Sequence, residues 1–135
     1  MLYEWLKDYQ QLVQDIDYLH FQLQNNQIEL KRWTSGDLYN VRLNEKSIAS
    51  NLEVTIEKIK EEIEFKEKQI EKLIQLVNTF KGLDHKILKL KYVDGMNLEM
   101  IAEKLSYSTS HIRKRHAELI RTVKFVEMYH LSSLD

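Results

Sequence analysis

Apolar side chains recur at alternating intervals of three and four residues along two long stretches of this sequence, and the chain contains no proline. The first stretch covers residues 2–33 and the second covers residues 45–80. This alternation is typical of a helix that buries one narrow seam against another helix. Because no proline interrupts the backbone hydrogen bonds, each stretch is predicted to form one long helix.

Each seam has one polar member. The first seam consists of Leu2, Trp5, Tyr9, Leu12, Ile16, Leu19, Leu23, Asn26, Leu30 and Trp33. The second seam consists of Ile48, Leu52, Ile56, Ile59, Ile63, Lys66, Ile70, Leu73, Val77 and Phe80. A polar Asn on a seam can set the register or the number of paired helices. The alternative interpretation is that Asn26 lies near a frayed helix end.

Residues 34–44 have no regular period and begin with Thr34-Ser35-Gly36-Asp37, so we predict a loop there. Two helices of similar length joined by one loop favour an antiparallel helical hairpin. Pairing of the helices within one chain and pairing between chains both remain open. Several apolar residues lie off the seams and need a further partner surface: Leu6, Val13, Phe21, Ile28, Val54 and Ile74.

Charge is divided unevenly along the chain. Residues 1–80 hold 10 Lys and Arg against 14 Asp and Glu, whereas residues 81–126 hold 10 Lys and Arg against 5 Asp and Glu. Residues 127–135 add two acids, and the whole chain has a net charge of −1. A basic segment attached to acidic helices predicts a polyanionic partner for the basic segment alone. We therefore expect three regions, at 1–80, 81–128 and 129–135.

The basic region is predicted to form three shorter helices. Gly82 is expected to end the second long helix, and a helix over 83–93 is expected to end at Asp94-Gly95. Asn97 and Ser108 are predicted N-caps, with a helix from Leu98 to Leu105 and another from Thr109 to about Met128. The expected packing positions are Leu83, Ile87, Leu90, Val93, Ile101, Ala102, Leu105, Ile112, Ala117, Leu119, Ile120 and Val123, with Phe125 or Val126.

Three features of this region coincide. Ala102 is a small residue where two helices would cross closely, Ser106 to Ser108 form a tight polar turn, and basic residues begin the following helix. Together they predict a helix-turn-helix module whose last helix, near residues 109–126, reads DNA. An ordinary solvated surface is the alternative for the basic residues. The predicted DNA-binding residues are Thr109, Ser110, His111, Arg113, Lys114 and Arg121.

No catalytic or metal-binding pattern is found in the sequence. The chain has no cysteine, and none of its five histidines pairs with another at i,i+4 around a carboxylate. It also lacks a phosphate-binding glycine loop and a nucleophile–base arrangement. We therefore expect no enzyme activity, no cofactor and no metal. The absence of cysteine and of a long apolar run favours a soluble, cytoplasmic protein that does not associate with a membrane.

Residues 83–123 resemble region four of bacterial sigma factors, in which the last helix reads a promoter element and the region touches RNA polymerase. The resemblance is carried by Leu88, Tyr92, Gly95, Leu98, Glu99, Ile101, Ala102, Leu105, Ser108, Ile112, Arg113, Ala117, Ile120 and Arg121. It implies that Thr109, Ser110 and Lys114 read bases and that Arg113 lies at the DNA backbone or at the edge of the groove. The sequence departs from the sigma pattern at Ser106 and Tyr107 in the turn, and at Thr109 and Ser110, where the sigma pattern has longer polar residues.

The chain also resembles small phage and prophage transcriptional regulators of the ArpU and RinA type. The shared features are a helical N-terminal region, the turn Tyr107-Ser108, and the basic run from Arg113 to Ala117. The expected partners are thus double-stranded DNA, host RNA polymerase and further copies of the chain bound through the long helices. One alternative is a small DNA-recognition subunit of a phage packaging terminase, which would form a ring. The other is a protein that binds polymerase without binding DNA.

Overall fold

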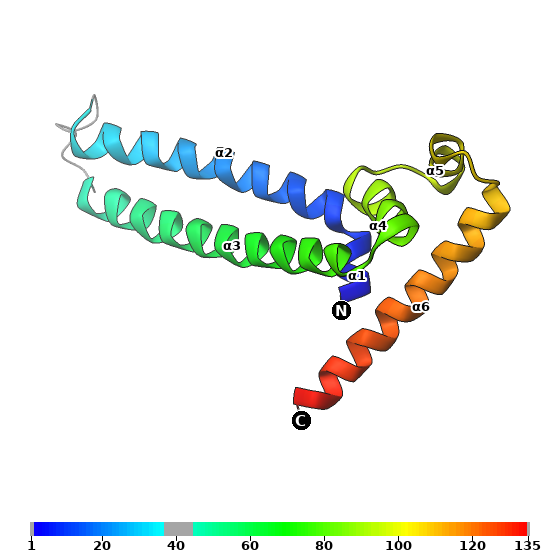
Figure 1. Ribbon diagram of the computed structural model, residues 1–135. Helices are drawn as coiled ribbons and strands as arrows, with labels where there is room; N and C mark the ends of the chain where they lie inside the picture. Colours follow the sequence, from blue (N-terminus) through cyan, green and yellow to red (C-terminus); the bar gives the residue numbers. More distant parts are fainter. Residues whose placement is uncertain (1, 37–44, 135) are drawn as a thin grey trace. The chain divides into compact units, whose positions relative to one another are not determined.

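The computed structural model describes residues 2–36 and 45–134, and the side chains of residues 2–36 and 47–129. Within these ranges, the regular structure is helical and no strand is present, so the predicted all-α class is confirmed (Figure 1). The predicted loop at 34–44 lies outside the described residues from position 37 onward. The helices are α1 (Leu2–Lys7), α2 (Tyr9–Thr34), α3 (Glu45–Thr79), α4 (Gly82–Leu88), the π-helix η1 (Lys89–Val93), α5 (Leu98–Leu105) and α6 (Thr109–Leu134).

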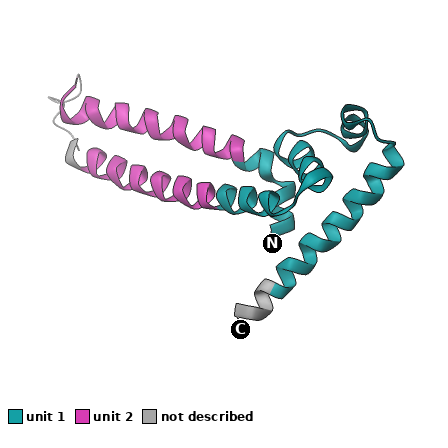
Figure 2. Ribbon diagram, in the orientation of Figure 1, with its two compact units in different colours: residues 1–12, 69–135 teal, residues 13–68 magenta. Residues whose placement is uncertain are grey.

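The chain divides into two compact units (Figure 2). Unit 1 consists of residues 1–12 and 69–135, and unit 2 consists of residues 13–68. Unit 1 therefore contains the first helix, the start of α2, the end of α3 and everything after α3. This division differs from the expected boundary at residue 80, because the first twelve residues group with the basic region.

In unit 2, the remaining parts of α2 and α3 pack against each other. Leu19 is buried together with Ile59 and Ile63. The Lys66 ammonium lies 3.8 Å from the Asp15 carboxylate, whereas Leu30 lines a shallow cleft with residues 53–60. As the residue number increases along α2, the residue number of the contacting position on α3 decreases. The two helix segments of unit 2 run antiparallel.

The predicted seams are the positions that become buried. Every described seam residue is buried or half-buried, including the two polar members. The Asn26 amide donates to the Gln22 carbonyl oxygen at 2.7 Å, which satisfies it within its own helix. Lys66 instead reaches across to Asp15. The polar interruption of the α3 seam is therefore compensated by an acid on the facing helix.

Unit 1 has a larger core, to which all of its helices contribute. The Leu6 side chain of α1 is completely buried in it, so this off-seam residue has its partner surface here. The Leu2 backbone N–H donates to the Glu127 carboxylate of α6 at 2.8 Å, which joins residues 125 positions apart. The buried members are Leu6, Leu12, Leu73, Val77, Ile87, Leu88, Leu90, Tyr92, Ile101, Ala102, Ile112, Leu119 and Ile120.

Three predicted helix boundaries are wrong. The helix expected over 2–33 is interrupted at Asp8, whose N–H is shared between the Glu4 and Trp5 carbonyls at 3.1 Å each. α3 ends at Thr79, and Gly82, with a φ of 60°, opens α4 and does not close α3. α6 continues to Leu134 and not to about Met128. No glycine or proline follows Gly95, so nothing in the sequence stops that helix.

Candidate nucleic-acid interface

The turn between α5 and α6 is held by side-chain caps on both helices. The Asn97 side-chain oxygen accepts the Met100 N–H at 2.8 Å, and the Ser108 hydroxyl oxygen accepts the His111 N–H at 3.1 Å. Both predicted N-caps are confirmed. Ser106 adopts the left-handed conformation, with φ 62° and ψ 38°, that usually favours glycine. The polar turn therefore keeps its geometry without a glycine.

α5 packs on the first turns of α6. Ile101, Ala102 and Ile112 are buried at this contact. The Tyr107 N–H donates to the Ala102 carbonyl oxygen at 3.0 Å, which closes the C-terminal end of α5. Ala102 is thus a small side chain that is almost completely buried in the core shared by α5 and α6. This packing fixes the direction in which α6 starts.

α4 and η1 form the support for these two helices. The Asp94 N–H donates to the Lys89 carbonyl oxygen at 3.0 Å, a five-residue interval that defines the π turn at the end of the element. Gly95 follows with a φ of 77°. From α2, the Gln10 side-chain amide donates to the Tyr92 carbonyl oxygen at 3.4 Å and to that of Val93. The start of α2 thus holds the end of η1.

A stripe of exposed residues follows the outer side of α6. Ser110, Lys114, Ala117 and Arg121 are spaced by four, three and four residues, and all are exposed. Ile112, Leu119 and Val123 lie on the opposite side and are buried. We call the four exposed residues the α6 outer stripe. Lys114 and Arg121 lie one on each side of the small Ala117 side chain. The helix surface between these two cations is therefore low enough for a DNA groove to approach it closely.

Three residues predicted to pack are found exposed. Ala117 belongs to the α6 outer stripe, and Phe125 and Val126 are also exposed. Ala117 is three residues from Lys114 and four from Arg121. Phe125 is also four residues from Arg121, so the helical period places both on the outer side. Val126 is five residues from Arg121 and is 40% exposed. The prediction that Ala117 and one of Phe125 and Val126 are core residues is therefore wrong.

The predicted DNA-binding residues fall into two groups. Ser110, Lys114 and Arg121 are exposed, and within the described side chains they make no hydrogen bond or ion pair beyond their own helix. The other three have local roles. Thr109 is half-buried, and the His111 ring stacks on Tyr107 with centroids 5.1 Å apart. The structure thus leaves two cations of α6 available on its outer side.

Arg113, the remaining predicted contact, is paired with an acid. Its guanidinium donates to the Glu99 carboxylate in the first turn of α5. The pKa of Glu99 is lowered, first by the hydrogen bond from its own backbone N–H and then by Arg113. Arg113 therefore links the two helices of the turn, and any contact it makes with DNA would compete with Glu99.

Arg115 is the basic residue whose role the sequence did not reveal. Its guanidinium makes two hydrogen bonds of 2.6 Å to the Asp84 carboxylate of α4 and one of 2.9 Å to Glu118. This bidentate geometry is the strongest form of an Arg–carboxylate pair, and Asp84 raises the pKa of Arg115 further above its ordinary value. Arg115 is thereby neutralised. The signal available in the sequence was Asp84 itself, an acid in a basic region.

His116 lies behind the stripe and contacts the π-helix. Its Nε2 is 2.7 Å from the Tyr92 hydroxyl oxygen, and the two rings stack with centroids 5.8 Å apart. Burial, and then the neighbouring Lys91, lower the pKa of His116 below its ordinary value. Burial also raises the pKa of Tyr92. Both groups are therefore held neutral near pH 7, and their contact is structural.

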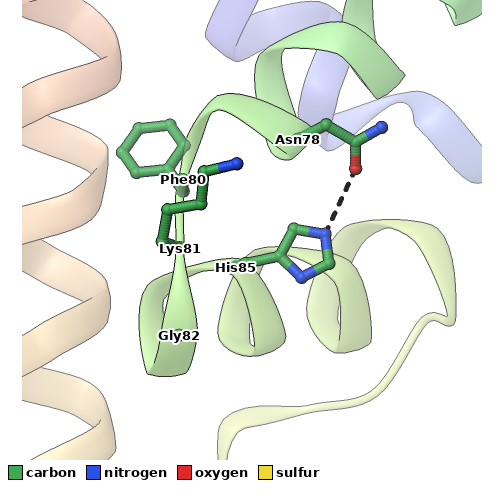
Figure 3. Close-up of a pocket in the computed structure, with 5 residues that line it drawn as sticks. All are labelled: Asn78, Phe80, Lys81, Gly82 and His85. Atoms are coloured by element: carbon green, nitrogen blue, oxygen red, sulfur yellow. Dashed lines mark hydrogen bonds between the residues drawn. The ribbon is translucent and has the colours of Figure 1, made fainter.

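The junction of α3 and α4 carries a shallow cleft of about 300 Å³ (Figure 3). His85 reaches back from α4, and its Nε2 lies 3.2 Å from the Asn78 side-chain oxygen at the end of α3. Phe80, Lys81 and Gly82 complete the lining. Among the described residues, no group of three or more His, Asp or Glu could hold a metal ion. Likewise, none of the described helices is both long and apolar enough to cross a membrane.

Comparison with protein-family models, with curated proteins and with solved structures gave no match to this chain.

Proposed function

We propose that this chain is a sequence-specific DNA-binding transcriptional regulator of phage origin. In this proposal, α5 and α6 act as a sigma-like helix-turn-helix, and the antiparallel helices α2 and α3 form a hairpin. The observation that carries the proposal is the α6 outer stripe, where Lys114 and Arg121 are exposed without a described acidic partner. Ser110 and Lys114 lie in the first turns of α6, the part of a recognition helix that reaches base edges, whereas Arg121 lies farther along the same side.

The distribution of charge around α6 supports the same assignment. Residues 109–117 contain three Lys and Arg, two His and no acid. On one flank Arg115 is neutralised by Asp84 and Glu118, so positive charge is concentrated on the outer stripe. Arg recognises guanine or phosphate through its fork, and Lys binds phosphate as a point charge. Ser110 adds a hydroxyl at the start of the stripe.

The decisive experiment is selection of bound sequences from a random duplex pool, followed by salt titration of the best binder. The double variant Lys114→Ala/Arg121→Ala should weaken binding at least about tenfold and reduce the slope of log affinity against log salt by about 2. The matched control is Lys58→Ala/Lys72→Ala, which removes two exposed cations from α3 and should bind as the parent does. Equal binding by the parent and the Lys114/Arg121 variant would overturn the assignment.

Two other outcomes would select the alternative functions. Binding to RNA polymerase with no affinity for any duplex would indicate a polymerase-binding protein. A large closed ring in solution, measured by mass, would favour a packaging subunit. The proposal predicts neither outcome, because the exposed cations of α6 need a polyanion and the exposed apolar surface described next fits a dimer.

A further inference from the structure

Within unit 2, the two helices expose surfaces of opposite chemical character. Residues 13–28 of α2 contain two acids and no Lys or Arg, whereas residues 53–68 of α3 contain ten charged side chains. Protein interfaces are depleted in charge at their centres and enriched in aromatic residues. The sequence of α2 therefore resembles an interface, and that of α3 resembles a solvated surface.

The uncharged part of α2 exposes large apolar side chains on one side. Tyr18, Phe21 and Ile28 are 61%, 58% and 54% exposed. They are three and seven residues apart, which places them on one helix side, and the buried Leu19 lies away from them. The polar residues among them, Gln14 and Asn25, are uncharged. We call this surface the α2 outer face: Gln14, Asp17, Tyr18, Phe21, Asn25, Ile28 and Lys31.

We propose that the α2 outer face binds the same face of a second copy of this chain, with the two α2 helices antiparallel about a two-fold axis near residues 23–24. An interface of this kind is isologous, so each contact occurs twice. In the heptad geometry of antiparallel helices, this axis places Tyr18 opposite Ile28 of the second copy and Phe21 opposite Asn25 of the second copy. Each large apolar side chain is then covered.

The charged residues at the border of the α2 outer face favour a second copy of this chain as the partner, and they favour the antiparallel orientation of the two helices. Asp17 and Lys31 are both exposed, and they lie two heptads apart at equal distances from the proposed axis. Each Asp17 would face Lys31 of the second copy, which gives two complementary pairs. In a parallel pair each g position faces an e position of the second copy, so Asp17 would face Gln22 and Lys31 would face Gly36. The antiparallel orientation is therefore the one that pairs these two opposite charges.

The size of the face predicts a reversible dimer. The exposed parts of Tyr18 and Phe21 amount to about 200–300 Å² per copy. With Ile28 and the surrounding polar side chains, two copies reach the lower end of specific interfaces, about 1,000–1,200 Å² in total. The inference concerns unit 2 alone and does not depend on DNA binding. A two-fold dimer would nevertheless suit a protein that reads two half-sites.

The first test is the mass of the full chain in solution, measured by sedimentation equilibrium over a range of concentrations. The parent should be a dimer, and Phe21→Glu should raise the dimer dissociation constant about 100-fold or more, as expected for an aromatic at the centre of an interface. Phe65→Glu is the matched control, because Phe65 is 62% exposed on α3 and lies among charged residues. Circular dichroism should show unchanged helicity for both variants, since neither aromatic is buried.

The second test is reversal of the predicted charge pair. Asp17→Lys and Lys31→Glu should each weaken the dimer about tenfold, and the double variant should restore parental affinity. A parent that is monomeric at about 0.1 mM would overturn the proposal. So would a dimer that Phe65→Glu or Phe125→Glu dissociates while Phe21→Glu leaves it intact. A double variant weaker than both single variants would overturn the proposed register.

Discussion

The two units bury their apolar side chains in different ways. In unit 2 the buried cluster is Leu19 with Ile59 and Ile63, which repeat along two facing helices. In unit 1 the cluster draws on α1, α2, α3, α4, η1, α5 and α6, and its members follow no single period. A repeating seam is built from equivalent positions, whereas a core built from many elements depends on each position separately. The packing of unit 2 can therefore be predicted from the periodicity of the sequence. The core of unit 1 cannot, and it is the core that a single substitution should destabilise most.

Of the substitutions that test this difference between the units, Leu6→Ala should produce the largest loss of unfolding free energy in unit 1. Leu6 is completely buried in the unit 1 core, and truncation of such a residue costs about 3 kcal/mol of unfolding free energy. Trp5 packs against the same core, whereas Trp33 lies in unit 2. Urea unfolding followed by Trp5 fluorescence in a Trp33→Phe background measures the loss in unit 1. The matched change Val13→Ala, at an exposed position nearby in sequence, should cost less than about 1 kcal/mol. Equal effects of the two changes would show that α1 does not contribute to the core.

Ser106→Gly should have a smaller effect of opposite sign. A left-handed backbone costs an L-residue about 1–2 kcal/mol, and part of the gain from glycine is lost through the entropy of the unfolded chain. With a φ of 62° at Ser106, the substitution should stabilise unit 1 by about 0.5–1 kcal/mol. Thermal unfolding checks this prediction. Ser108→Gly is the control, since Ser108 lacks a positive φ and caps α6. A destabilising Ser106→Gly would mean that the turn has another geometry.

The smallest predicted effect concerns pH. The pKa of His116 is lowered by burial and by Lys91, so the unfolded chain binds this proton more readily than the folded chain. The contribution of His116 is fully present above the ordinary histidine pKa of about 6.5 and is lost as pH falls below it. Unfolding free energy measured between pH 7.5 and 5.5 should therefore decline more in the parent than in His116→Gln. His20→Gln serves as the control because His20 is an exposed residue of unit 2. Identical pH dependence in the parent and His116→Gln would contradict the assignment.

Local periodicity was sufficient to predict the buried seams and the extent of the two helical stretches, but not the interruption at Asp8. It was also sufficient for the two caps, because Asn97 and Ser108 act on backbone groups three residues away. The packing of α1 on α6 could not be predicted in this way. It depends on contacts such as that of Leu2 with Glu127, which no period along the chain encodes.

The candidate site shows the same distinction. Ser110, Lys114 and Arg121 are exposed as the helical period predicts. The pairings that periodicity does not reveal are those in which a distant residue binds a cation: Asp84 binds Arg115, and Glu99 binds Arg113. Ala117, a predicted packing residue, is exposed because its spacing from Lys114 and Arg121 places it on the outer side of α6. Periodicity was the better guide to exposure, and tertiary partners were needed to decide which cations remain available.

The contact between α1 and α6 has a consequence for synthesis. A chain emerges from the ribosome with its N-terminal residues first. Leu6 and Leu12 must therefore wait for Ile112, Leu119 and Ile120 before the unit 1 core can close. The facing helices of unit 2 are complete by residue 68 and can pair well before that. The helix that we propose reads DNA, α6, is thus the last element to be added to the fold. A chain interrupted before α6 would contain the paired helices α2 and α3 but no DNA-binding helix.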